Sequence, residues 1–125
     1  MASVLDQPLP GATTRKIGGV TVDEVPAGSG RVKRIVYPAG WRWSTDMRPV
    51  SGTERCMHAH VGFLAQGKIG IQYADGCRAE FTAPAVVAIP PDHDGWVLGP
   101  EAAVLIQFDW AGDSVTRLGL AAHRH

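Results

Sequence analysis

Two histidines, His58 and His60, lie two residues apart in the sequence and are the residues best suited to chemistry. Alternate residues of a β-strand project to the same face. In an extended segment, one face would therefore carry Glu54, Cys56, His58 and His60. Neutral imidazole, thiolate and carboxylate all bind metals, and this mixture suits zinc, iron, manganese or nickel. The spacing therefore predicts a divalent-metal site if this face points into the protein.

The same histidines have a plainer interpretation, because many strand faces point to solvent. Two hydrated histidines on such a face would have no role. On an inward face, buried imidazoles need hydrogen-bond partners. Polar side chains gathered there can satisfy one another only around water or a metal. Both interpretations remain open from the sequence alone.

A third histidine, His93, lies in the turn-rich segment 90–96 and is the candidate third ligand. If this loop folds over the end of a barrel, it brings His93 to the histidine pair. As an ordinary turn residue, His93 would instead bond a nearby carbonyl. Its neighbour Asp94 would either orient the His93 ring or stabilise the turn.

The elements that must position these residues are short strands. Fifteen glycines and nine prolines make up about a fifth of the 125 residues, and both residue types break helices. Apolar residues alternate along Lys68–Tyr73, and Asp75-Gly76 then predicts a tight hairpin with positive φ at both residues. Eight to ten such strands predict an all-β sandwich or closed barrel. One short helix is expected, capped by Asp113-Ser114 and ending at Leu120.

The composition excludes several classes of protein and partner. Twelve basic and twelve acidic residues give a formal net charge of zero without a basic cluster, which argues against nucleic acid as a partner. No apolar run approaches the roughly 20 residues needed to cross a bilayer, so no membrane association is expected. The absence of a secretory signal predicts a cytoplasmic protein. There, Cys56 and Cys77 would be thiols, although the sequence leaves a disulfide between them open.

The segment from Val32 to Phe108 resembles the cupin superfamily, and in particular small bacterial single-domain cupins, most of unassigned function. The first cupin motif has a glycine, five residues, a His-x-His pair and then a glutamate. Gly52 and His58-Ala-His60 match its front half, and the run into Ile89-Pro-Pro91 is similar to the middle of the fold. The resemblance implies a single-domain antiparallel jelly-roll β-barrel, with a metal inside it bound by three histidines and a glutamate.

The sequence departs from this motif at the ligand positions. Leu64 and Ala65 stand where the glutamate is expected. Counted backward from Gly67, the glutamate position falls on His60 and the histidine positions fall on Glu54 and Cys56. The histidine of the second motif falls on Gly95, and the nearby histidine is His93. A rearranged site is therefore expected, with His58, His60 and His93 as metal ligands, and Glu54 or Cys56 as additional candidates.

The resemblance also frames the predicted organisation and function. Residues 1–12 are expected to form a flexible arm, 13–112 the cupin-like barrel and 113–125 a tail or short helix. The pocket is expected to include Glu54, Cys56, Trp43, Tyr73, Asp94 and Trp96. It would bind a small molecule beside zinc, iron, manganese or nickel, in an enzyme whose reaction and catalytic residues the sequence does not specify. The alternative is a non-catalytic binding or sensory module without metal. A homodimer is expected, because small cupins generally pair through their sheets.

Overall fold

Alternating apolar residues build strands along most of the chain. The computed structural model describes residues 3–112 and 114–120, and within these ranges the chain forms nine strands. In chain order they are β1 (Thr13–Ile17), β2 (Val20–Ala27), β3 (Gly30–Tyr37), β4 (His60–Gln66), β5 (Lys68–Tyr73), β6 (Arg78–Thr82), β7 (Ala85–Ile89), β8 (His93–Leu98) and β9 (Ala103–Asp109).

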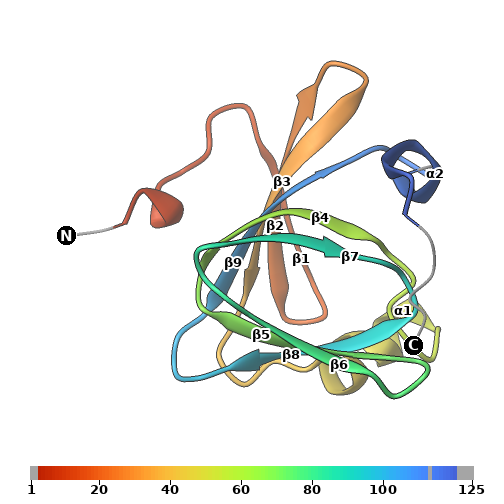
Figure 1. The fold of residues 1–125 in the computed structure, drawn as a ribbon. Helices are drawn as coiled ribbons and strands as arrows, with labels where there is room; N and C mark the ends of the chain where they lie inside the picture. Colours follow the sequence, from red (N-terminus) through yellow and green to blue (C-terminus); the bar gives the residue numbers. More distant parts are fainter. Residues whose placement is uncertain (1–2, 113, 121–125) are drawn as a thin grey trace.

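The strands form two sheets that face each other (Figure 1). The larger sheet has the order β1-β2-β3-β9-β4-β7, and the smaller has the order β6-β5-β8. Every pairing is antiparallel. The expected antiparallel jelly roll is thus confirmed. The ladders between the described strands do not join the two sheets into a closed barrel, which corrects that part of the expectation.

The hairpin of β5 and β6 follows the predicted pattern on its strands and differs in its turn. Ile69, Ile71 and Tyr73 are buried on the inner face, as their spacing predicts. Of the two turn residues, Gly76 has a positive φ of 89°, whereas Asp75 does not. The Asp75 carboxylate instead accepts a hydrogen bond from the Cys77 amide at 2.9 Å, which stabilises a wider turn.

The core lies between the sheets, where alternate residues of β4, β7 and β9 point inward. Leu64, Val87, Ile89 and Leu105 are each at most 2% exposed. Burial of one such side chain stabilises the fold by roughly 1.5–3 kcal/mol. On β9 the inward face is that of Leu105, so Phe108 points outward and is 47% exposed.

Four short helices occur among the described residues, although the sequence predicted only one. The expected C-terminal helix is α2 (Ser114–Leu118), and the others are η1 (Val4–Asp6), η2 (Trp43–Met47) and α1 (Arg48–Ser51). None of these helices is long and apolar enough to cross a membrane. The predicted cap residue Asp113 lies outside the described residues, as do residues 1–2 of the predicted arm and 121–125 of the predicted tail.

The segment η2–α1 is not extended, although Trp41 and Trp43 lie two residues apart in the sequence, as residues on one face of a strand would. Trp43 instead begins a π-helical turn, and the Asp46 carboxylate accepts a hydrogen bond from the Arg42 amide at 2.9 Å. Gly52, with φ 76°, ends α1. Both tryptophans are nonetheless buried, Trp41 at 7% exposed and Trp43 at 5%. The local hydrogen bonds of the turn outweigh the extended preference that the sequence pattern indicated.

Candidate metal centre and its cavity

Backbone hydrogen bonds hold Cys56 against the start of β8. The Cys56 amide donates to the His93 carbonyl at 2.7 Å, and the Asp92 amide donates to the Cys56 carbonyl at 2.7 Å. Asp92 has a φ of 74°, in the left-handed region that aspartate tolerates better than most residues. Its carboxylate also accepts a hydrogen bond from Arg55 at 2.8 Å. The turn before β8 thereby fixes the position of the chain segment that precedes β4.

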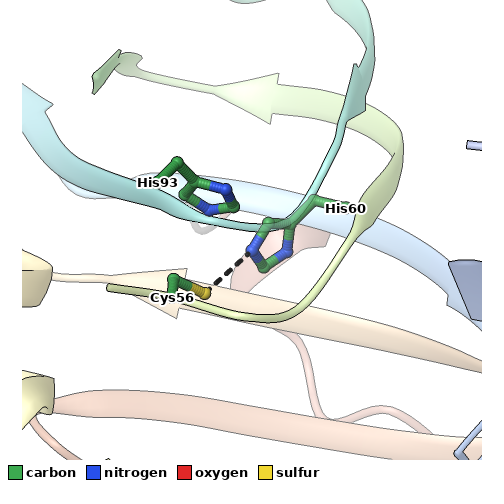
Figure 2. A group of neighbouring side chains, drawn as sticks. All are labelled: Cys56, His60 and His93. Carbon is green, nitrogen blue, oxygen red and sulfur yellow. Dashed lines mark hydrogen bonds between the residues drawn. The ribbon is translucent and has the colours of Figure 1, made fainter. Parts of the chain in front are cut away.

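Three side chains from separate segments converge at this point (Figure 2). Cys56 comes from the segment before β4, His60 from the first position of β4, and His93 from the first position of β8. Their potential ligand atoms all lie within 4.8 Å of one another. The Cys56 Sγ lies 3.7 Å from the His60 Nε2. Cys56 and His93 are buried, and His60 is partly buried.

The orientation of the His93 ring is fixed by a single acceptor. Its Nδ1 lies 2.7 Å from the Pro90 carbonyl oxygen. A carbonyl oxygen can only accept, so Nδ1 carries the proton and Nε2 keeps its lone pair. The Tyr73 ring packs edge-on against His93 with a centroid distance of 6.3 Å. Bonding to a nearby carbonyl, the plainer role considered for His93, is therefore compatible with a role as a ligand.

The orientation of His60 depends on a chain of hydrogen bonds through β9. The Gln107 Nε2 donates to the Asp109 carboxylate at 2.7 Å, which fixes the amide so that its oxygen faces His60. The His60 Nδ1 donates to this Gln107 Oε1 at 2.6 Å. His60 therefore also keeps the lone pair on Nε2, the atom that faces Cys56. The two imidazoles are thus held in the tautomer that metal ligation requires.

The protonation of the three side chains follows from their surroundings. Burial and the nearby His93 lower the pKa of His60 to about 3, so its imidazole is neutral. Burial also lowers the pKa of His93. Burial raises the pKa of Cys56 to about 11, although a backbone hydrogen bond at His58 acts in the opposite direction. A bound cation would supply the positive charge that stabilises a thiolate here.

The far end of this hydrogen-bond chain is a charged group on the same inner face. The Asp109 carboxylate forms ion pairs with Arg31 and, at 3.2 Å, with the Lys33 Nζ. Burial by itself would raise the pKa of Asp109, but hydrogen bonds from Arg31 and Gln107 and the charge of Lys33 lower it overall. Asp109 is consequently an anion whose charge is already compensated.

A cavity of about 410 Å³ opens beside the three side chains. This volume falls in the range of small-molecule sites. Most of its wall is apolar, and its aromatic wall residues are Tyr37, Trp41, Trp43 and Trp96. The Trp41 indole is anchored by a 2.8 Å hydrogen bond to the Gly18 carbonyl. The donor atoms of the cluster thus lie beside a space that a small apolar molecule could occupy.

Two residues of the predicted site lie outside the cluster. Glu54 and His58 are both exposed. His58 lines the cavity, and Glu54 does not. Residues 57–59 form no regular strand, and β4 begins only at His60. The two-residue repeat expected from Glu54 to His60 does not hold over this stretch.

The remaining predicted pocket residues surround the cavity in different ways. Trp43 and Trp96 line it, whereas Tyr73 contacts His93 without lining it. Gly70 lacks the Cβ that would collide with the Trp96 indole, so this ring can pack closely against β5.

Asp94 lies on the opposite face of β8 from its neighbour His93. Its carboxylate accepts hydrogen bonds from the Ser44 amide at 3.0 Å and from Arg42 at 3.2 Å. Asp94 therefore fastens η2 to β8, and the Pro90 carbonyl is what orients His93.

The structure adds site residues that the sequence analysis did not single out. Gln107 and Asp109 lie on the inner face of β9, and Lys33 lies on the inner face of β3. The alternation of β9 contained a signal for them, because Gln107 and Asp109 share a face with Leu105.

The donor set fits a divalent metal. Two neutral imidazole nitrogens and one thiol sulfur are ligands that zinc and iron accept. Three protein ligands leave a coordination position for water or another small ligand, as in catalytic zinc sites. The two cysteines are not joined by a disulfide, which agrees with the prediction of thiols.

Comparison with known proteins places this fold among solved structures. No protein-family model matches the sequence, and no curated protein matches it. A Cupin 2 conserved barrel domain protein from Salinispora arenicola superposes with a TM-score of 0.55 at 20% identity, covering 90% of this chain and 93% of that one.

Two further structures agree. An RmlC-like cupin from Shewanella frigidimarina gives a TM-score of 0.51 at 19% identity, covering 78% of this chain and 81% of that one. The cupin domain of Schizosaccharomyces pombe Cnp3 gives a TM-score of 0.51 at 16% identity, over 75% of this chain. The match spans 62% of that domain's chain. These likenesses confirm the resemblance found in the sequence: the chain has the fold of the cupin superfamily.

Proposed function

We propose that this protein binds a divalent transition metal through Cys56, His60 and His93, and a small molecule in the adjoining cavity. The observation that carries the proposal is the convergence of the three ligand atoms within 4.8 Å. Their orientation adds to it, because hydrogen bonds at both Nδ1 atoms leave each Nε2 lone pair available. Zinc and iron suit this sulfur and nitrogen set better than manganese or nickel.

Different residues would bind the metal and contact the small molecule. Cys56, His60 and His93 would hold the metal, which would supply Lewis-acid chemistry at its open position. Gln107 and the Pro90 carbonyl keep the two imidazoles in orientation. The apolar wall, which includes Trp41 and Trp43, would exclude water and hold an apolar molecule. The fold does not select one reaction, so the reaction class is left open.

Metal analysis of the purified protein tests the proposal. The chain, expressed in medium containing zinc, iron, manganese and nickel, should contain about one equivalent of metal, as a single three-ligand site predicts. The triple variant Cys56→Ala, His60→Ala, His93→Ala should contain none. Wild-type protein that remains metal-free after dialysis against each metal would contradict the proposal. The variant His58→Ala tests the alternative ligand set, in which His58 replaces Cys56.

A binding module without metal is the second candidate, and the cavity favours it. Its wall is predominantly apolar, and the Cys56 thiol is protonated in the absence of a cation. Such a module would bind apolar molecules equally well in the wild type and in the triple variant. Calorimetric titration of both proteins with one probe, 3-phenylpropan-1-ol, separates the candidates. A metal-dependent affinity favours the metal protein.

The outer face of the larger sheet supports the predicted homodimer. Phe63 pairs across strands with Val86 and Ile106, and Phe63 is 42% and Val86 80% exposed. A second copy packed on this face would remove these side chains from water. Sedimentation should show a dimer that Phe63→Glu converts to a monomer, and a monomeric wild type would contradict it. A cytoplasmic location stays a prediction from the sequence.

A further inference from the structure

We propose that the molecule bound in the cavity is an amphipathic carboxylate, whose acid group pairs with Arg15 and whose apolar body lies along the cavity wall. This inference rests on the proposed function, because it names the ligand class for the same cavity. It concerns the exposed rim of the cavity, defined here as Arg15, Ile17, Val50 and Met57.

Exposed apolar side chains at the rim point to an apolar ligand body. Ile17 is 39%, Val50 56% and Met57 52% exposed, and all three line the cavity. They come from three segments: β1, α1 and the stretch before β4. The buried wall continues this apolar surface through Val22, Ile35 and Trp43. A ligand that extends from the wall to the rim would remove both surfaces from water.

The charges of the lining define the polar end of the ligand. Arg15, Lys33 and Asp109 are the charged lining residues. Lys33 and Asp109 pair with each other, and Asp109 also pairs with Arg31. Among the ion pairs recorded between described residues, none includes Arg15. Of the three charged residues that line the cavity, Arg15 is therefore the one whose guanidinium is available to pair with a charged ligand.

The position of Arg15 on β1 directs it to the cavity. Arg15 pairs with Val22 of β2, and Val22 is part of the cavity wall. Ile17, two residues further along β1, lies on the same face. Lys16 lies between them, is exposed, and is not among the residues that line the cavity. The strand thus offers one cation toward the cavity and one cation away from it.

The chemistry at this end favours a single negative charge. A guanidinium binds a carboxylate with two parallel hydrogen bonds. A phosphate monoester would carry about two charges, and the lining offers one cation that is not already paired. A carboxylate on an aromatic or aliphatic body satisfies both the lone cation and the apolar wall.

Two probes with the same carbon skeleton test this assignment: 3-phenylpropionate and the uncharged 3-phenylpropan-1-ol. The metal-loaded wild type should bind the acid more tightly than the alcohol in calorimetry, and the preference should shrink as salt is added. Arg15→Gln should weaken acid binding by roughly fivefold, the size of one exposed ion pair, and leave alcohol binding unchanged. Arg15→Lys should restore part of the loss. The matched control Lys16→Gln should change neither affinity.

The outcomes separate this inference from the metal proposal, because metal content is measured in the same samples. Metal-loaded protein without a preference for the acid would overturn the inference and leave the metal proposal standing. The inference also fails if Arg15→Gln and Lys16→Gln behave alike, or if acid binding depends on His60 and not on Arg15. Metal-free protein with an Arg15-dependent preference would support the ligand class and overturn the metal proposal.

Discussion

The buried cluster and the exposed rim of the cavity are built in opposite ways. In the cluster, each imidazole is held by a hydrogen bond at Nδ1, and Cys56 is held by backbone bonds to the turn before β8. At the rim, Ile17, Val50 and Met57 are between 39% and 56% exposed. A fixed donor set suits a ligand with strict geometry, such as a metal. An exposed apolar rim suits a ligand that is recognised by shape and water exclusion.

Because the two regions are built differently, substitutions in the cluster and at the rim should affect different kinds of binding. Changes in the cluster should alter metal binding steeply, because coordination requires each atom in place. Changes at the rim should alter only the affinity for the small molecule, and modestly, because apolar contact area is lost gradually.

Removal of one imidazole should abolish tight metal binding. His60→Ala and His93→Ala should each lower zinc affinity by more than about a hundredfold. Loss of a residue that only hydrogen-bonds a metal ligand has a smaller effect, of about ten- to a hundredfold. Competition with a chromogenic chelator measures this affinity. His58→Ala is the matched control, two residues from His60 and outside the cluster, and should bind zinc as the wild type does. Equal losses in all three variants would refute the separation.

Removal of the charge at the end of the hydrogen-bond chain should destabilise the fold. Asp109→Asn removes the nearer anionic partner of Arg31 and Lys33, which retain only Glu24 at 3.5 Å and 3.9 Å, and should lower the free energy of unfolding by about 2 kcal/mol at neutral pH. The folded pKa of Asp109 is lowered, so its contribution is complete above the ordinary value of 3.8 and is lost as pH falls through the folded pKa. Urea unfolding across this range measures it.

The pH dependence provides the control for this prediction. The gap in unfolding free energy between wild type and Asp109→Asn should narrow as the solution is acidified below about pH 4. Glu101→Gln, at an exposed position, should show no gap at any pH. A gap that stays constant from neutral to acidic pH would mean that the charge of Asp109 is not what stabilises the fold.

Loss of the amide that orients His60 should weaken metal binding to an intermediate degree. Gln107→Leu removes the acceptor for the His60 Nδ1 and should lower zinc affinity by roughly tenfold. Gln66→Leu is a suitable control, because Gln66 is a partly buried glutamine outside the cluster, whose amide donates to the Ala102 carbonyl at 3.0 Å. If both variants lose stability but only Gln107→Leu loses zinc affinity, Gln107 positions the ligand.

Rim substitutions should have the smallest effect. Val50→Ser and Met57→Ser should each weaken binding of 3-phenylpropan-1-ol by about threefold, because each removes apolar contact area. Zinc affinity should stay unchanged in both. Val86→Ser, an equally conservative change at an 80% exposed position outside the cavity, should leave probe binding intact. A loss of zinc affinity in the rim variants would show that the two regions are coupled.

Strand alternation predicted the fold well where it was regular. The repeat of Ile69, Ile71 and Tyr73 identified both the strand β5 and its buried face, because a period of two is a direct consequence of strand geometry. The partial match to the cupin motif around Gly52 and His60 predicted the jelly-roll topology. The strand pattern alone could not predict how the strands are ordered. The short helix α1 escaped prediction, because it depends on Pro49 and Gly52 acting together at its two ends.

The candidate site was predictable only in part. The sequence identified His60, His93 and Cys56 individually, and the backward alignment from Gly67 placed ligand positions at Cys56 and His60. It did not predict that the chain leaves strand geometry before β4, which removes His58 from the cluster. That departure is caused by backbone pairing between Cys56 and the turn at Asp92, 36 residues away in the sequence. The spacing of residues within the segment 54–60 cannot predict a contact with such a distant residue.

Cobalt(II) titration tests whether Cys56, His60 and His93 bind one metal ion together. A cobalt ion bound by Cys56, His60 and His93 should produce an intense near-ultraviolet thiolate-to-metal absorption, together with visible bands of a low-coordinate site, saturating at about one equivalent. Cys56→Ser should lose the thiolate absorption, and His58→Ala should retain it. A wild type that binds cobalt without this absorption, or binds none, would contradict the account.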